Sequence, residues 1–578
     1  MKRISSLTVS GLVTIFLILI SCKSMKYPDI ALINGKVITV DSSFSIAEAL
    51  AISGEKIISV GSNSKIKRIS GKETQIIDLK GRTVIPGLID AHLHPDAAAI
   101  SELQEEIPDV HSMDQLLNWI RLQAEGKTKD SWIIFQKFFP TRLEEMRQPT
   151  LGELDNAAPY NPVFLNGSFG GMINSCAMKI SGISRISADP GVLKDRITGL
   201  PTGFIRASAF HLLKLPVSKP LSKDEWIDAF SKMMKRYNRY GITSVHSGTG
   251  DMNTVRKYRQ MADSNMLTIR IFQNILFSDS TPVTKESVSE KLKNYQTATG
   301  GGNDWVKVGP LKVFLDGGIL TGTAYMKEPW GAKASEIFGI EDPSYRGIIN
   351  YRREELLAIV SAANDAGWSF TAHATGDGSV KMLLGVYNEV NSIKSIRGKR
   401  FSIIHGNFFD GPDIRLMKEL GVYANIQPAW FYKDADAMRF ILGDDKIRIF
   451  HPDLTMTNAG IVLNGGSDHM VKWDANASIN PYNPFLAMWS MITRTTERGS
   501  VIVPEEAISR EQALRIYTIN NSYASFEESI KGSIEPGKLA DIVVITDDFL
   551  TCPADRIKDI ESLLTIVGGK IVYSSSDF

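Results

Sequence analysis

The sequence predicts an α/β protein built on a (β/α)8 barrel. Between about residues 85 and 525, amphipathic helices alternate with short apolar strands, and a glycine separates many of these pairs. Such alternation is typical of parallel strands joined by helices. Histidine and aspartate residues, which can bind metals or transfer protons, follow several of the strands directly. In barrel enzymes the catalytic residues lie at these strand ends. The two chain ends are instead rich in short strands and turns.

Four helix–glycine–strand units pass through Gly241, Gly367, Gly421 and Gly460. The barrel strands that we predict are Ile242–His246, Leu311–Leu315, Ser369–His373, Phe401–His405, Val422–Gln427 and Ile461–Gly465, with a further strand ending near His92. The barrel domain is expected over 85–529. Its surplus length, about 96–221, is too long for one loop and predicts an inserted subdomain over the barrel mouth.

The chain ends are expected to pair into one small β-sandwich. Residues 28–84 contain short strands with Asn34-Gly35 between two of them, a dipeptide that favours a hairpin turn. A similar pattern returns over 530–578. Neither segment has enough strands to bury two faces alone, so a composite sandwich from 28–84 and 530–578 is predicted.

The first residues have the pattern of an export signal. Lys2-Arg3 precedes an apolar run, and Leu19-Ile20-Ser21-Cys22 resembles the bacterial lipoprotein box. Residues 1–22 are therefore predicted as a signal peptide, with Cys22 lipidated and the protein anchored in the bacterial cell envelope, on the outer membrane or the periplasmic face. An ordinary cleaved signal and a single membrane anchor are the alternatives.

Charge argues for a small-molecule partner. The chain has 65 basic and 64 acidic residues, a net charge of +1, so nucleic acid is not expected as a partner. A membrane is expected only through the lipid, and a homodimer is left open. Three cysteines are too few for a disulfide framework.

Histidines at strand ends predict a metal site. His92 and His94 leave a strand on one face, where both imidazoles can reach one ion; two surface histidines are the alternative. His373, His405 and Asp468 follow other predicted strands. Because the carboxyl ends of barrel strands converge, these five side chains should form one cluster, and neutral imidazoles with a carboxylate suit zinc or a similar ion.

These motifs resemble the amidohydrolase superfamily, and more closely its branch of N-substituted formamide deformylase-like enzymes. The stretches that carry the resemblance are 84–94, His373-Ala374-Thr375-Gly376-Asp377, Gly466-Ser467-Asp468, 531–541, Pro140-Thr141-Arg142, Asn174-Ser175 and Phe314-Leu315-Asp316-Gly317. The resemblance implies that His92 and His94 bind one metal and that His373 and His405 bind a second. It implies that a carbamate on Lys312 bridges two zinc ions and that Asp468 binds metal and handles protons. A one-metal site with an ordinary Lys312 is the alternative.

The implied activity is hydrolysis of an amide or cyclic amide bond by metal-activated water, with Asp468 moving the proton. Deamination, hydrolysis of an ester or lactone, and ligand binding without turnover remain alternatives. Relatives usually carry a histidine where this chain has Phe169, and a glutamate where it has Ile404. We therefore expect a more apolar pocket and a preference for bulky apolar amides, with Trp430, His246 and His469 as further candidates for substrate contact.

Overall fold

The computed structural model describes residues 27–578 except 104–106, 218–219, 279–281 and 341. The predicted signal peptide and the lipidation site at Cys22 lie outside the described residues. Within the described part, no helix has the length and apolar character needed to cross a membrane.

The centre of the molecule is a parallel eight-stranded barrel, which confirms the predicted fold class. Its strand order is β8-β14-β15-β16-β17-β18-β19-β20, and every neighbouring pair is parallel. The strands are β8 (Leu88–Leu93), β14 (Ile242–Ser247), β15 (Arg270–Leu276), β16 (Val306–Phe314), β17 (Phe370–Ala374), β18 (Ser402–His405), β19 (Tyr423–Ile426) and β20 (Leu463–Gly465).

The first and last strands meet where the metal ligands were predicted. The backbone N–H of Asp468 donates to the carbonyl oxygen of His92 over 2.6 Å. A Cβ on Gly466 would lie 2.4 Å from the backbone nitrogen of His92, so only glycine allows this approach. The contact brings the two histidines of β8 beside Asp468.

Strand β15 was not predicted, because its sequence mixes apolar and polar residues. Ile271 and Ile275 pack in the layer between the barrel and its helices, whereas the side chain of Gln273 donates to the carbonyl oxygen of Ser247. Arg270 is buried and forms an ion pair with Asp541 from the C-terminal part of the chain. These polar partners come from distant segments and hide the strand pattern.

Helices surround the barrel and bury one large apolar core. The helices that follow the strands include α6 (Lys223–Arg239), α7 (Met252–Asp263), α8 (Lys285–Asn294), α10 (Arg353–Asp365), α11 (Asp377–Ile393), α12 (Gly411–Leu420), α13 (Pro428–Leu442), α15 (Asp453–Ala459), α16 (Pro484–Thr493), α17 (Arg510–Ile516) and α18 (Ile519–Ala524). Several begin with a side-chain cap, as at Ser222 of α6, and several end at a left-handed glycine, as at Gly421 of α12. These local signals explain why the alternation was readable in the sequence.

Both chain ends build a β-sandwich. One sheet has the order β5-β4-β1-β6, and the other has the order β23-β22-β21-β7-β2-β3. Its strands are β1 (Ile30–Ile33), β2 (Lys36–Ile38), β3 (Ile46–Ala47), β4 (Ala49–Ser53), β5 (Lys56–Gly61), β6 (Gln75–Asp78), β7 (Thr83–Pro86), β21 (Ile542–Ile545), β22 (Ser562–Val567) and β23 (Lys570–Ser574), with helix α1 (Asn63–Ile69). Residues from both ends share its core.

The predicted hairpin at Asn34-Gly35 is wrong. Strand β1 pairs with β4 and β6, whereas β2 pairs with β3 and β7 in the other sheet. The backbone N–H of Asn34 donates to the Asn63 side chain, and a Cβ on Gly35 would lie 2.3 Å from Leu79. The turn therefore connects β1 in one sheet to β2 in the other.

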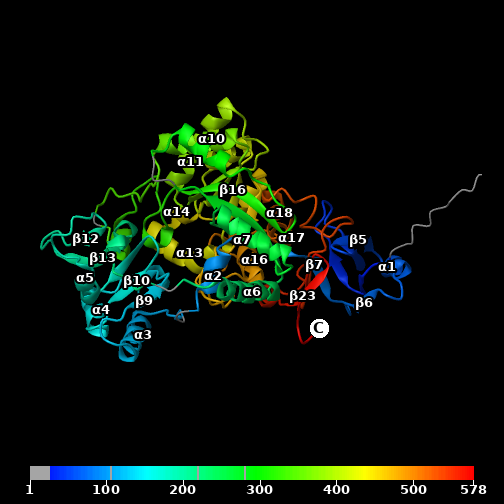
Figure 1. The fold of residues 1–578 in the computed structure, drawn as a ribbon, viewed down its shortest axis with the longest axis horizontal. Coiled ribbons are helices and arrows are strands. Elements are labelled where there is room, and N and C mark those ends of the chain that lie inside the picture. Colours follow the sequence, from blue (N-terminus) through cyan, green and yellow to red (C-terminus); the bar gives the residue numbers. More distant parts are fainter. Residues whose placement is uncertain (1–26, 104–106, 218–219, 279–281, 341) are drawn as a thin grey trace, which may run out of the picture.

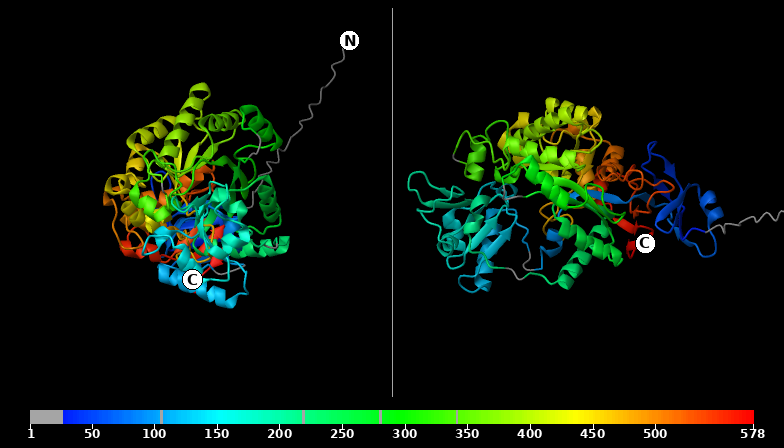
Figure 2. Two further views of the ribbon diagram at one scale, coloured as in Figure 1. Left: turned by 90° about the vertical axis from the view of Figure 1, so that its left-hand side faces the viewer. Right: turned by 45° about the horizontal axis from the view of Figure 1, so that its top comes forward.

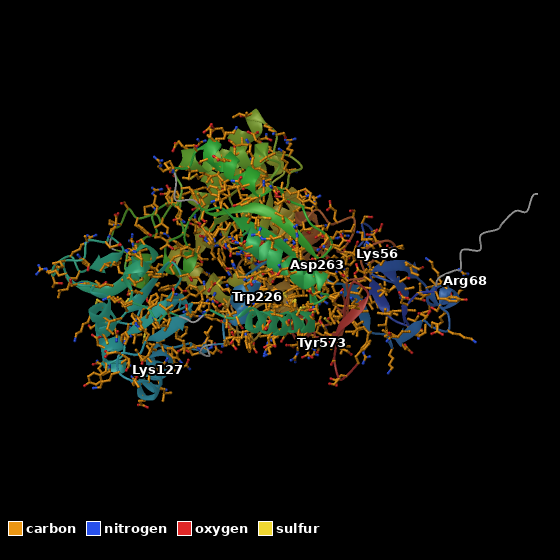
Figure 3. All side chains as sticks on the ribbon, in the orientation of Figure 1. Lys56, Arg68, Lys127, Trp226, Asp263 and Tyr573 are labelled. Atoms are coloured by element: carbon orange, nitrogen blue, oxygen red, sulfur yellow. The ribbon has the colours of Figure 1, made fainter. Side chains whose placement is uncertain are left out.

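The inserted subdomain is a five-stranded sheet with helices. Its order is β12-β13-β11-β10-β9. Its elements are α3 (Met113–Gly126), β9 (Ile133–Gln136), α4 (Leu151–Ala157), β10 (Val163–Asn166), β11 (Gly170–Ile173), α5 (Ser175–Ser181), β12 (Val192–Lys194) and β13 (Pro201–Arg206). Figures 1 and 2 place it at one end of the barrel, with the sandwich at the other. The labelled Lys127 and Arg68 mark these two ends in Figure 3.

Candidate active site

A cavity of about 430 Å³ lies where the barrel meets the inserted subdomain. The predicted residues that line it are His92, His94, Phe169, Lys312, His373, His405, Trp430 and Asp468. They come from different barrel strands, from the helix after β19 and from the inserted subdomain. The structure thus brings together side chains that are up to 376 positions apart in the chain, from His92 to Asp468.

Asp468 lies against both histidines of β8. Its Oδ1 is 3.1 Å from Nε2 of His94 and 3.4 Å from Nε2 of His92. These three residues offer ligand atoms that all lie within 4.8 Å of one another. Nδ1 of His94 contacts Oγ1 of Thr249 at 3.1 Å, which leaves Nε2 of His94 directed at Asp468.

The other two histidines close the cluster on its opposite side. The rings of His373 and His405 lie with centroids 4.4 Å apart, and that of His405 is 5.3 Å from His92. Nδ1–H of His405 donates to Oε1 of Gln427 over 2.7 Å, which leaves its Nε2 as a potential ligand atom. Nε2–H of His373 donates to the carbonyl oxygen of Gly317 over 3.1 Å, which leaves its Nδ1.

Electrostatics keep these imidazoles neutral, which is the form that binds metal. Burial is the largest effect, and it lowers the pKa of His405 to about 4. Burial and the nearby cationic or potentially cationic groups, among them Lys312, lower the pKa of His92 and of His373 well below the ordinary value. Burial also lowers the pKa of His94, against the opposing effect of Asp468. All four imidazoles therefore favour the neutral form, which is the donor set of a metal centre.

Lys312 lies fully buried among these ligands. Its Nζ has no hydrogen-bond partner among the described residues, and both ring nitrogens of His92 are likewise unpartnered. Burial lowers the pKa of Lys312 to about 7, although the charge of Asp468 opposes this shift. Unsatisfied buried polar atoms are costly, so these atoms fit a bound metal and the carbamate that a neutral lysine can form.

Asp90 and Asp316 shape the backbone around the cluster. Oδ1 of Asp90 accepts from the backbone N–H of His92 over 2.9 Å and from that of Ser467 over 3.2 Å. Asp316 accepts from the backbone N–H groups of Thr375 and Gly376, both over 2.9 Å. Each carboxylate therefore joins the ends of two barrel strands and positions the histidines that they carry.

Two aromatic residues that the sequence singled out, Phe169 and Trp430, form walls of the cavity. The indole of Trp430 stacks on the His405 imidazole, with centroids 4.6 Å apart and an angle of 10° between the planes. The ring of Phe169 lies 5.6 Å from that of His373. Each ring lies against one of the predicted ligand histidines and contributes apolar surface to the cavity.

Two predicted substrate contacts are wrong. His469 does not line the cavity, because Tyr237 donates to its Nδ1 (3.0 Å) and its Nε2–H donates to the carbonyl oxygen of Lys472 (2.7 Å). His246 lies buried in β14 against Phe272, also outside the cavity lining. Contacts with residues that are distant in the sequence, Tyr237 for His469 and Phe272 for His246, hold both side chains away from the cavity.

Sequence reasoning missed Lys137. This residue follows β9 of the inserted subdomain and lines the cavity beside the predicted ligands. The available signal was its place three residues before Pro140-Thr141-Arg142, within a mainly apolar stretch. Apolar residues complete most of the remaining wall: Ala97, Phe139, Phe314, Ile319, Leu320, Met470, Val471 and Ile479.

Comparison with known proteins agrees with this geometry. The model of the Amidohydrolase family matches residues 75–573. The chain belongs to the amidohydrolase family. It is a metal-dependent hydrolase that acts on carbon–nitrogen bonds of small molecules.

Two curated relatives match nearly the whole chain. The N-substituted formamide deformylase of Arthrobacter pascens is 26% identical over 94% of this chain and 98% of its own length. Protein LONG AFTER FAR-RED 3 of Arabidopsis thaliana is 28% identical over 94% of this chain and 91% of its own length. Among solved structures, an uncharacterized metal-dependent hydrolase from Pyrococcus horikoshii has a TM-score of 0.66 at 22% identity, covering 91% of this amidohydrolase and 99% of that chain.

Proposed function

We propose that this amidohydrolase cleaves the amide or cyclic amide bond of a small molecule with an apolar body. The observation that supports this most is one cavity in which four imidazoles, Asp468 and the unpartnered amine of Lys312 face a mainly apolar wall. A relative over 94% of the chain is named as an N-substituted formamide deformylase, which supports an amide as the substrate class.

The proposed metal complement is two divalent ions, with zinc as the preferred metal. His92, His94 and Asp468 would hold one ion, and His373 and His405 would hold the other. Lys312 would lie between them as a carbamate, formed when its neutral amine adds to carbon dioxide and releases one proton. Metals bound here would supply Lewis acidity, which lowers the pKa of water and polarises a carbonyl group.

Asp468 is the proposed proton carrier. Burial by itself would raise its pKa, but the pKa is held below the ordinary value, with the hydrogen bond to His94 as the largest lowering effect. Asp468 is therefore ionised at neutral pH, and it can accept a proton from the attacking water. It can then pass that proton to the leaving nitrogen, which departs as a neutral amine.

The cavity walls would exclude bulk water from this exchange. Phe169 and Trp430 cover His373 and His405, and Phe314 lies against His373 with centroids 5.1 Å apart. A substrate with an aromatic or aliphatic group would fill the remaining apolar space, and a small polar amide would leave it unfilled.

The test is metal analysis followed by an assay of the metal-loaded protein on N-formyl and N-acyl amines. Esters, lactones and heterocyclic amines belong in the same panel, because they probe the alternative reactions. We expect turnover of amides with bulky apolar groups. A protein that hydrolyses only esters, deaminates only heterocycles or turns over none of these compounds would contradict the proposal.

For location, we propose export and lipid anchoring through Cys22, with a small molecule as the partner of the folded domain. Support comes from the residues before Cys22 in the sequence alone.

A further inference from the structure

Lys137 lies at the junction of two cavities above the metal ligands. It lines the large cavity with His94 and Asp468, and it also lines a smaller neighbouring cavity with Arg142, Lys433 and Lys472. It leaves the end of β9, while Ser168 follows the end of β10, and these two strands are parallel neighbours. Nζ of Lys137 donates to Oγ of Ser168 over 2.7 Å.

The backbone holds both members of this pair in a set position. Lys137 has φ 59° and Ser168 has φ 73°, a left-handed region that residues other than glycine rarely adopt. Oδ1 of Asn166 accepts from the backbone N–H of Ser168 over 2.8 Å, and the Asn166 amide donates to Gln136 on the next strand. These hydrogen bonds therefore hold the Lys137 ammonium group in place at the ends of β9 and β10.

Lys137 differs from the other cations around it in its ion pairing. Arg142 pairs with Asp434, Lys433 with Glu497 and Lys472 with Asp109.

Among the residues that the structure describes, Lys137 has Ser168 as its hydrogen-bond partner, and Asp468 is the one charged group that acts on it. Burial outweighs the attraction of Asp468, so the pKa of Lys137 is lowered. Within the described part of the chain, this partly desolvated ammonium has one hydroxyl partner and no paired counter-ion, and an anion in the cavity would supply one.

From this geometry we infer that Lys137 recognises a carboxylate on the substrate. This inference rests on the proposed function and narrows it to amides that combine an apolar body with one carboxylate, as in N-acyl amino acids. The apolar side chain fills the large cavity, the scissile amide faces the metal ligands, and the carboxylate accepts a charge-assisted hydrogen bond from Nζ of Lys137. Lys137 is a specificity residue in this scheme, and Ser168 positions it.

The test compares N-formylphenylalanine, as each enantiomer, with N-formylphenethylamine, which lacks only the carboxylate. In the metal-loaded wild type we expect kcat/KM to favour the acid by about 10- to 100-fold, the range for a hydrogen bond to a charged group. Lys137→Met should remove most of this preference by lowering kcat/KM for the acid far more than for the neutral amide. Lys137→Arg should restore part of it.

Lys194→Met is the matched control. Lys194 belongs to the same subdomain, donates to the carbonyl oxygens of Arg185 and Ser187 and lies outside the cavity, so its loss should leave the ratio unchanged. If Lys137→Met does not fold, Ser168→Ala provides the test, with an expected 3- to 10-fold loss of preference (on the order of one weakened hydrogen bond). Equal losses for both compounds, or a wild type that prefers the neutral amide, would overturn the inference.

A binding measurement separates this inference from the proposed function. If the wild type turns over no amide of the wider panel, the proposed function fails, and the same two compounds are then titrated by calorimetry into metal-loaded wild type and Lys137→Met. Tighter binding of the acid that depends on Lys137 would still support carboxylate recognition. Equal affinities in both proteins would refute it.

Discussion

Arg142 of the inserted subdomain and Asp434 of the barrel form a two-pronged ion pair. Nε of Arg142 lies 2.9 Å from Oδ1 of Asp434, and Nη2 lies 3.0 Å from Oδ2. Asp434 is fully buried on α13. The same helix carries Trp430 and Phe431, four and three residues before Asp434. This pair holds the subdomain, and with it Lys137 and Phe169, against the barrel over the predicted metal ligands.

Removing this pair should loosen the subdomain. Arg142→Leu leaves the buried Asp434 carboxylate without a partner, which typically costs about 3–5 kcal/mol of stability. Chemical denaturation measures this loss, and limited proteolysis should show earlier cleavage within 96–221. Arg147→Leu is the control, because Arg147 pairs with Glu153 near the surface and such pairs contribute about 1 kcal/mol or less. Equal stability of the two variants would contradict the role of Arg142.

Lys312→Ala should lower the metal content. Without the amine no carbamate can form, so the metal content should fall from about two ions per chain towards one or none. Elemental analysis after dialysis measures this. Lys307→Ala is a control on the same strand, because Lys307 pairs with Glu527 away from the cavity. Two tightly held ions in Lys312→Ala would rule out the bridge.

Asp468→Asn should abolish most turnover and keep the fold. The amide has nearly the same shape but cannot carry the proton, and general acid–base catalysis contributes about 100-fold or more. Steady-state kinetics with circular dichroism and metal analysis test this. Asp474→Asn, which alters a turn outside the cavity, should leave the rate near that of the wild type. Normal activity in Asp468→Asn would remove it from the mechanism.

Phe169→His should change substrate preference. A polar ring beside His373 weakens the apolar wall, so kcat/KM for bulky apolar N-acyl amines should fall relative to polar ones, by about 10-fold within the range that apolar pockets discriminate. Phe440→His, at an exposed position of α13, serves as the control. A constant ratio across the panel would show that Phe169 does not select the substrate.

Cys22→Ser should prevent lipidation. In a bacterial host, the wild type should incorporate labelled fatty acid and partition into detergent, whereas the serine variant should do neither. Cys176→Ser keeps the sequence before residue 22 and should behave as the wild type does. Equal labelling of Cys22→Ser would mean that the lipoprotein box was misinterpreted.

The sequence by itself determined the barrel and the main set of candidate ligands. Glycines after amphipathic helices and short apolar runs are local signals, and they placed the strands that end near His373 and His405. Because parallel barrel strands end on one face, residues at those ends were expected to converge with His92 and Asp468, and the structure brings them into one cavity.

Only the tertiary structure decided which further side chains face that cavity. His469 is withdrawn from it because Tyr237, 232 positions earlier, binds its ring, and Lys137 reaches it because Arg142 fixes the inserted subdomain on α13. Asn34-Gly35 joins two sheets because β1 and β2 find different partners. The direction of a side chain depends on contacts between distant segments, and no local pattern of apolar and polar residues encodes those contacts.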